Sequence, residues 1–269
     1  MRYARELLLF AAYSASIVGI LLIPGLLLPS AKGVFFWGET NAIKAAAALL
    51  LVWLFNNRFC GKDLRYAGLR WDRASGADLA VGLAFGAAMI GSVFGMLLLV
   101  GGLRVTWRHP SAEMLWLVPV LIGIQGLQVC AEELLFRTFI LRRLSEWMPV
   151  WSASLLWGGF FGFLHLLGGG NTAASIVGIV AAGIMLNLAY FVAGGSVWLP
   201  FGIHLAWNAL QMHVFFSRRL FEVDYSGPAW LNGGGDPEAS LISVAVVSIA
   251  ALAMAWRLRA GYSARARVS

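Results

Sequence analysis

The most regular feature of the sequence is a series of long apolar runs separated by short polar segments. A helix needs about 20 mostly apolar residues to cross a bilayer. Eight runs meet this requirement: Leu7–Leu28, Val34–Phe55, Leu79–Val100, Met114–Arg137, Trp151–Leu167, Ala173–Val192, Val197–Phe216 and Ser240–Trp256. The second run is the weakest, because Glu39 and Lys44 interrupt it. The pattern predicts an all-α, polytopic membrane protein with about eight transmembrane helices, and it predicts that Gly101–Glu113 is a short polar loop.

Composition supports this class. The 269 residues are 60% hydrophobic and 12% charged, with a mean hydropathy of +0.77. A soluble domain carries about 25% charged residues, so a soluble fold is excluded. The first apolar run is longer than the apolar stretch of a signal peptide and has no small-residue cleavage site after it, so we expect a retained helix.

The basic residues predict the orientation. With eight spans and a cytoplasmic N-terminus, most of them fall on the cytoplasmic side: Arg2, Arg5, Arg58, Lys62, Arg65, Arg70, Arg73, Arg142, Arg143, Arg257, Arg259, Arg265 and Arg267. The outer side holds Lys32, Arg104, Arg108, Arg218 and Arg219. This bias follows the positive-inside rule and places both termini in the cytoplasm. The formal charge of +7 then reflects topology and contact with anionic membrane lipids. Its dispersal over several loops argues against a nucleic-acid partner.

The polar residues that could take part in a reaction are concentrated in the middle of the chain. Residues 1–111 form N-terminal helices without histidine in their spans, and 217–269 form a loop, a last helix and a basic tail. Between them, Glu, His, Asn and Gln appear inside several apolar runs. Ionisable groups inside a membrane are expensive and usually mark function. We therefore predict a catalytic core over 112–216, within one integrated membrane domain.

The first polar element of this core is Glu132-Glu133-x-x-x-Arg137. Positions four apart share a helix face, so Glu133 and Arg137 can form an ion pair. Glu132 is rotated by about 100° from Glu133 and can face a cavity instead. The alternative is a charged helix end anchored at the cytoplasmic surface. Each intramembrane carboxylate costs roughly 2.5–3.5 kcal/mol, and two side by side favour a site.

Two further elements contribute histidines. In Phe161-x-x-x-His165 the spacing stacks a phenyl ring on the imidazole, and Gly158, Gly159 and Gly162 would let another helix approach closely. In His204-x-x-x-Asn208 both side chains lie on one face and can donate hydrogen bonds, as an oxyanion stabiliser must. Taken singly, either pair could be a hydrogen-bonded clamp between helices.

Together, the three elements resemble the CPBP family, also called Abi or type II CAAX prenyl endopeptidase-like intramembrane proteases. The matching residues appear in the family's order and span Glu132–Asn208. The resemblance implies a hydrolase that cleaves a membrane-associated protein or peptide. It implies that Glu132 and His165 activate water, that His204 and Asn208 hold the oxyanion, and that Glu133, Arg137 and Phe161 support the site. Nothing in the sequence indicates a prenylated substrate.

Metal dependence is left open by the sequence. A zinc site could be built from Glu132, His165 and His204, but the H-E-x-x-H pattern and C-x-x-C pairs are absent from the chain. We favour chemistry without a cofactor.

Two other functions compete with the protease. The same fold can act as a bacteriocin-immunity or membrane scaffold protein, although a scaffold has no need of both glutamates and both histidines. A proton-coupled transporter is the other alternative, but no inverted repeat is present. We expect a prokaryotic cytoplasmic membrane protein, because no organelle signal is present.

Overall fold

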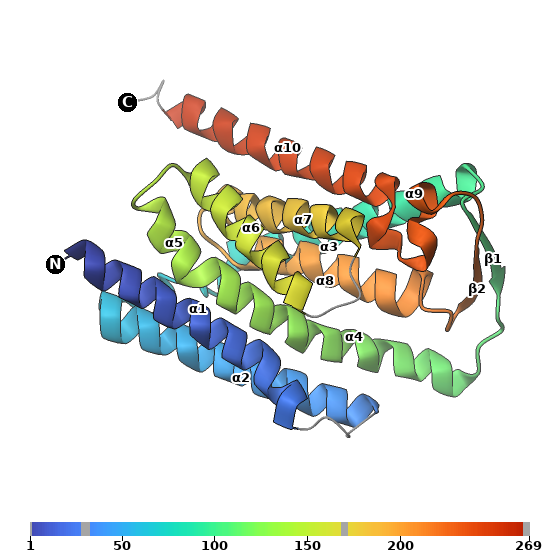
Figure 1. The fold of residues 1–269 in the computed structure, drawn as a ribbon, viewed down its shortest axis with the longest axis horizontal. Coiled ribbons are helices and arrows are strands. Elements are labelled where there is room, and N and C mark those ends of the chain that lie inside the picture. Colours follow the sequence, from blue (N-terminus) through green and yellow to red (C-terminus); the bar gives the residue numbers. More distant parts are fainter. Residues whose placement is uncertain (1, 28–32, 168–171, 266–269) are drawn as a thin grey trace.

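The computed structural model describes residues 2–27, 33–167 and 172–265, and it is almost entirely helical (Figure 1). Its elements are α1 (Arg2–Leu27), α2 (Val34–Leu54), η1 (Phe55–Phe59), α3 (Arg73–Leu99), β1 (Leu103–Trp107), α4 (Ala112–Glu133), η2 (Leu134–Thr138), α5 (Ile140–Ser145), α6 (Val150–Leu167), α7 (Ala173–Val192), α8 (Trp198–Leu210), η3 (Gln211–Phe215), β2 (Phe221–Tyr225), α9 (Ala229–Asn232), η4 (Gly233–Gly235), η5 (Pro237–Ala239) and α10 (Leu241–Arg265). Predicted positions at Leu28, Lys32 and Arg267 lie outside the described residues.

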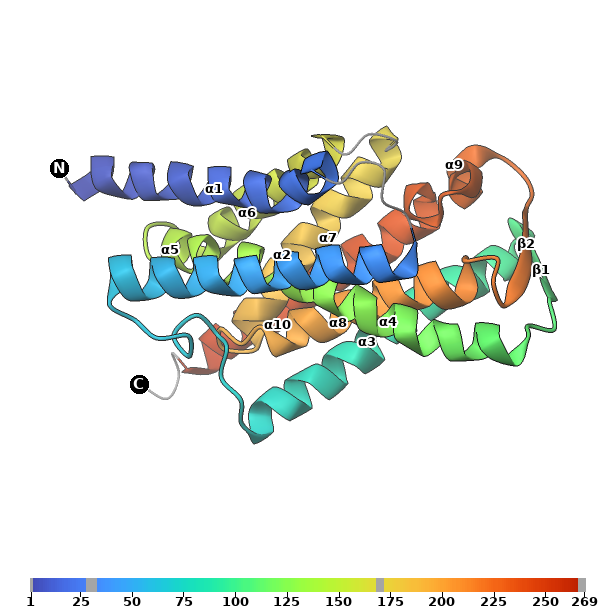
Figure 2. The same ribbon diagram turned by 90° about the horizontal axis from the view of Figure 1, so that it is seen from below.

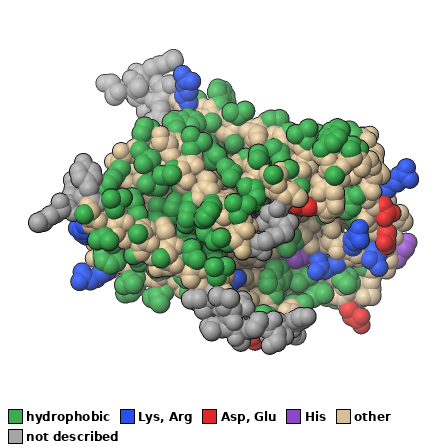
Figure 3. Space-filling model, in the orientation of Figure 1, with side chains coloured by type: hydrophobic (Ala, Val, Ile, Leu, Met, Phe, Trp, Pro, Cys, Tyr) green, Lys and Arg blue, Asp and Glu red, His purple; other side chains and the backbone are tan. Residues whose placement is uncertain are grey.

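Within the described residues, seven helical segments are long and apolar enough to cross a membrane, so the chain is a polytopic membrane protein. The expectation of about eight spans includes Val197–Phe216, which is not one of the seven. There the α-helix α8 has 13 residues and continues as the five-residue π-helix η3. Figure 3 shows hydrophobic side chains over most of one face, with most Lys and Arg side chains toward its two ends.

The helices form one bundle in which α4 lies between α2 and α8 (Figures 1 and 2). One core cluster joins α1, α2, α6 and the segment from α4 to α5. A second cluster joins α3, α7, α8 and α10. The segment 112–216 therefore packs against both the first and the last helices of the chain.

Glycines set the closest helix contacts. A Cβ on Gly158 or Gly162 of α6 would lie 2.6 or 2.3 Å from side-chain atoms of α7, which confirms the predicted close approach at these two positions. Gly159 has open space instead. The α3–α8 contact is as tight, because a Cβ on Gly86 would lie 2.3 Å from the carbonyl oxygen of Ile203. Small residues let backbones approach in this way, and here they fix the position of α8.

One prediction about a connection was wrong. The segment Gly101–Glu113, expected to be a polar loop, contains β1, which pairs antiparallel with β2. Apolar residues alternate along both strands, and Leu103 and Val223 are buried against α3. This alternation with a period of two is typical of a strand. The alternation alone does not reveal the pairing, because the partner strand lies more than 100 residues away. The sheet lies at the end of the bundle opposite both termini (Figures 1 and 2).

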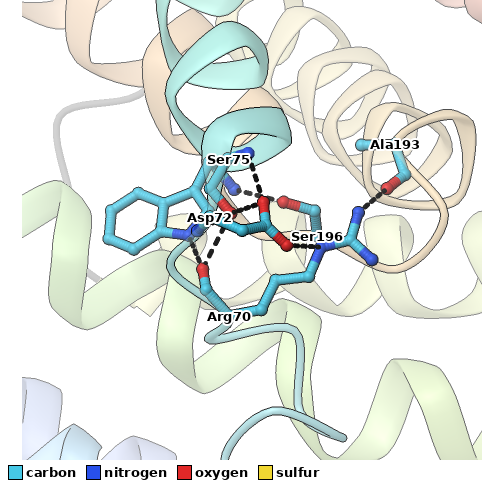
Figure 4. Close-up of polar contacts among 6 residues, drawn as sticks. Arg70, Asp72, Ser75, Ala193 and Ser196 are labelled. Atoms are coloured by element: carbon cyan, nitrogen blue, oxygen red, sulfur yellow. Dashed lines mark hydrogen bonds and ion pairs between the residues drawn. The ribbon is translucent and has the colours of Figure 1, made fainter.

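At the other end, the start of α3 is tied to the connection between α7 and α8 (Figure 4). Asp72 caps α3 by accepting a hydrogen bond from the Ser75 backbone N–H at 2.8 Å. Arg70 donates to the carbonyl oxygen of Ala193 at 3.2 Å, and its own carbonyl accepts from the Trp198 indole at 2.5 Å. These contacts hold α3 and α8 in register where α8 begins.

Candidate active site

The buried ion pair of α4 is the centre of the candidate site. Nε of Arg137 lies 3.2 Å from Oε2 of Glu133, and the two side chains are 1% and 2% exposed, which confirms the predicted pairing. Arg137 lies in the π-helix η2 that directly follows α4, a geometry frequent at functional sites. Its guanidinium carbon lies 5.1 Å from the ring centroid of Phe161. The aromatic face thus adds a cation–π contact that offsets part of the cost of burying the charge.

His204 connects α8 to both glutamates of α4. Its Nδ1 lies 2.8 Å from Oε1 of Glu133, and its Nε2 lies 3.6 Å from Oε2 of Glu132. A carboxylate only accepts hydrogen bonds, so Nδ1 of His204 carries a proton and donates to Glu133. When Nε2 is protonated as well, the two carboxylates flank an imidazolium.

Glu132 faces away from Arg137 and toward a cavity, as the helical geometry predicts. The Gln128 amide donates a hydrogen bond to Oε1 of Glu132 at 3.0 Å. The cavity has a volume of about 120 Å³, and both residues line it. One carboxylate of the doublet is therefore held by a guanidinium, and the other is presented to the cavity.

His165 lines the same cavity from α6. Its ring centroid lies 4.7 Å from that of Phe161, which confirms the predicted contact, but the two ring planes are tilted by 56° and are not stacked. Nδ1 of His165 lies 2.9 Å from the carbonyl oxygen of Phe161. Because a carbonyl only accepts, Nδ1 is the protonated nitrogen of this contact, so in a ring with one proton Nε2 is the acceptor.

Asn208 completes the set one helical turn after His204, and it also lines the cavity. Glu132, His165, His204 and Asn208 thus come from α4, α6 and α8 and meet around one small space. The remaining wall is mostly apolar and includes Ile179, Met185 and Val247. A carboxylate, two imidazoles and an amide thus border the same space.

Two polar residues of the cavity were missed by sequence reasoning. Glu238 in η5 and Ser243 in α10 line it from the far end of the chain. Burial raises the pKa of the Glu238 carboxyl, and the negative charge of Asp236 acts in the same direction. The signal available in the sequence was the acidic pair Asp236 and Glu238 directly before the last apolar run.

Two other intramembrane amides, Asn187 and Gln125, do not line the cavity. Asn187 of α7 donates to the Ser154 carbonyl oxygen of α6 at 3.1 Å. Gln125 is fully buried and does not line the cavity.

The arrangement does not fit the zinc alternative. Among the described residues, no three His, Cys, Asp or Glu side chains are grouped so that they could hold a metal ion. Glu132, His165 and His204 therefore share a cavity without forming a ligand set.

Residues 112–210 match the family model described as Type II CAAX prenyl endopeptidase Rce1-like. The matched segment contains all seven residues for which the sequence predicts a catalytic or supporting role, and the match confirms the family resemblance over this segment. A comparison with curated proteins gave no match. The segment thus carries the sequence pattern of a protease family whose substrates are proteins.

Proposed function

We propose that this protein, whose residues 112–210 carry the Rce1-like pattern, is an intramembrane endopeptidase. Its substrate would be a membrane-associated protein or peptide. The observation that supports this most strongly is the meeting of Glu132, His165, His204 and Asn208 around one cavity. Hydrolysis of a peptide bond needs a base for water and donors for the oxyanion, and this set offers both.

In this proposal Glu132 is the general base. Gln128 holds one of its oxygens, so the other is available to take a proton from water. The acceptor nitrogen of His165 orients the same water from the opposite helix. The water oxygen then bonds to the peptide carbonyl carbon, and the π electrons of the carbonyl group move to the carbonyl oxygen. Glu132 returns the proton to the leaving nitrogen as the C–N bond breaks.

The oxyanion would be held from α8. The Asn208 amide is a donor in any protonation state, and His204 donates through Nε2 when both ring nitrogens carry protons. The contact between Nδ1 and Glu133 stabilises that charged ring. Preorganised donors of this kind each contribute about 2.7–4 kcal/mol to the transition state.

We further propose that both termini face the cytoplasm. The two termini lie at the same end of the bundle, and that end holds most of the basic residues of the loops (Figures 1 and 2). This agrees with the positive-inside rule if α8 with η3 counts as an eighth crossing. Membrane lipids and a membrane protein substrate are then the partners of the chain.

The test compares cells that carry the wild-type protein with cells that carry Glu132→Gln. We expect a full-length membrane protein to accumulate, and its fragments to disappear, in the Glu132→Gln strain. His165→Ala and Asn208→Ala should give the same pattern at equal expression. Glu113→Gln, an exposed position at the start of the same helix, is the matched control.

Quantitative mass spectrometry of the membrane fraction provides the readout. If no protein differs between wild type and Glu132→Gln, the endopeptidase proposal fails, and a scaffold or immunity role would replace it. If cleavage persists in a folded Glu132→Gln protein, the assignment of the base is wrong.

A further inference from the structure

The cavity has a second polar end that the Rce1-like segment does not supply. Glu238 of η5 and Ser243 of α10 line it, and both follow residue 210, where the family match ends. The endopeptidase chemistry proposed above uses neither residue. Their position in the same cavity as Glu132 raises the question of what they bind.

The Glu238 carboxylate is held in place by the protein. The side chains of Trp207 and Gln211 lie close enough to the Glu238 carboxyl to lower its pKa, against the effect of burial. Asp236 accepts a hydrogen bond from the backbone N–H of Glu238 at 3.0 Å and fixes the turn. The turn also lies against α7, because a Cβ on Gly178 would lie 3.3 Å from the Glu238 carbonyl oxygen. Glu238 is therefore a positioned group and not a surface carboxylate that happens to point inward.

Ser243 gives an independent indication of a ligand. Ser243 is 2% exposed, and its hydroxyl has no hydrogen-bond partner among the residues that the structure describes. Buried polar atoms are nearly always paired, by protein, water or a ligand. A donor or acceptor bound in the cavity beside Glu238 would pair this hydroxyl.

The charges around the cavity favour a cation. Glu133 has Arg137 as its partner, but no Lys or Arg is among the described residues that line the cavity. Two carboxylates, Glu132 and Glu238, thus face an apolar space in which only imidazoles can provide positive charge. A carboxylate removed from water is costly unless it is paired. Glu132 already has Nε2 of His204 at 3.6 Å, so a cationic group from the substrate would pair with Glu238.

We propose that Glu238, with Ser243, binds a cationic group of the substrate, either a Lys or Arg side chain or a free N-terminal ammonium. The inference rests on the proposed endopeptidase function and adds a substrate class to it. Because Glu132 and Glu238 line one small cavity, the cationic group would lie at a fixed, short distance from the scissile bond. Glu238 then determines specificity and takes no part in bond cleavage.

The experiment digests a defined mixture of synthetic peptides with the full-length protein in detergent micelles. Half of the peptides have free N-termini and half are acetylated, which separates an N-terminal ammonium from Lys and Arg side chains. Cleavage sites are read by mass spectrometry for wild type, Glu238→Gln, Ser243→Ala and Glu132→Gln. Glu222→Gln, an exposed carboxylate on β2, is the matched control.

We expect sites with a cationic group at one fixed position to be enriched about tenfold in the wild type and in Glu222→Gln. Glu238→Gln should lose this enrichment, and Ser243→Ala should reduce it. The enrichment is a ratio within one digestion, so it does not depend on total activity. Gln has the same size as Glu and keeps an acceptor for Trp207, so the substitution preserves packing.

Each other outcome is decisive. Cleavage without enrichment in the wild type, or enrichment that survives in Glu238→Gln, overturns the inference and leaves the endopeptidase proposal intact. A folded Glu238→Gln protein that cleaves nothing also overturns it, because a residue that only selects substrate leaves uncharged sites cleavable. If the wild type cleaves no more than Glu132→Gln, the endopeptidase proposal itself fails and the inference fails with it.

Discussion

Nδ1 of His204 lies 2.8 Å from Oε1 of Glu133, although 71 residues separate the two in the chain. The other oxygen of Glu133 contacts Arg137, so one buried carboxylate joins α8 to the end of α4. The two glutamates of the doublet therefore have different structural roles. Glu133 holds the site together, and Glu132 is left to face the cavity.

Replacing Glu133 should therefore destabilise the protein as well as abolish activity. In Glu133→Ala the Arg137 guanidinium would remain buried without its anion, and breaking a buried pair in this way costs about 3–5 kcal/mol. Glu133→Gln should cost less, because its carbonyl oxygen can still accept from His204. Unfolding in mixed micelles measures both variants, with Glu113→Ala as the exposed control. Equal stability of Glu133→Ala and wild type would contradict this role.

Gly86 should be essential for the position of α8. Any side chain there would collide with the Ile203 backbone, and the enforced separation of α3 from α8 would move His204 and Asn208. We expect Gly86→Leu to lower cleavage at least about tenfold, since overpacking costs about 1–3 kcal/mol or more. Gly91→Leu on the same helix, where a Cβ meets nothing within 4 Å, should be close to wild type. Activity and thermal stability are compared for the pair, and equal losses in both would show that the helix contact is not the cause.

Chelators should leave the proposed protease activity intact. The described part of the chain has no group of three metal-ligating side chains, so we expect cleavage to persist after dialysis against a strong chelator. Metal content measured on the same sample shows whether the treatment removed bound ions. Activity that disappears on chelation and returns with zinc would contradict the metal-independent scheme.

The cap on α3 should make stability depend on pH. Hydrogen bonds from Ser75 lower the pKa of Asp72, so the folded state favours the carboxylate. Its contribution is complete above about pH 4, where the unfolded carboxyl ionises, and it is lost as the pH falls through the lower folded pKa. Asp72→Ala should reduce the unfolding midpoint by roughly 2 °C at neutral pH. The difference should shrink in acid; a constant difference across pH would exclude ionisation as its origin.

The sequence determined the membrane class, the limits of most spans and the ion pair of Glu133 with Arg137. These follow from local rules, because the bilayer fixes the length of an apolar helix and helical periodicity fixes which neighbours share a face. The contact of the Phe161 ring with the His165 ring followed for the same reason, although its tilted geometry did not. Each of these features involves residues close together in the chain.

Only the tertiary structure decided the rest. It paired His204 with Glu133, paired β1 with β2 and brought Glu238 and Ser243 into the cavity. These contacts join segments far apart in the chain, and the periodicity of one segment carries no information about the partner that another will present to it. Close packing at glycines then selects one arrangement of helices, and that arrangement places the polar groups around one cavity.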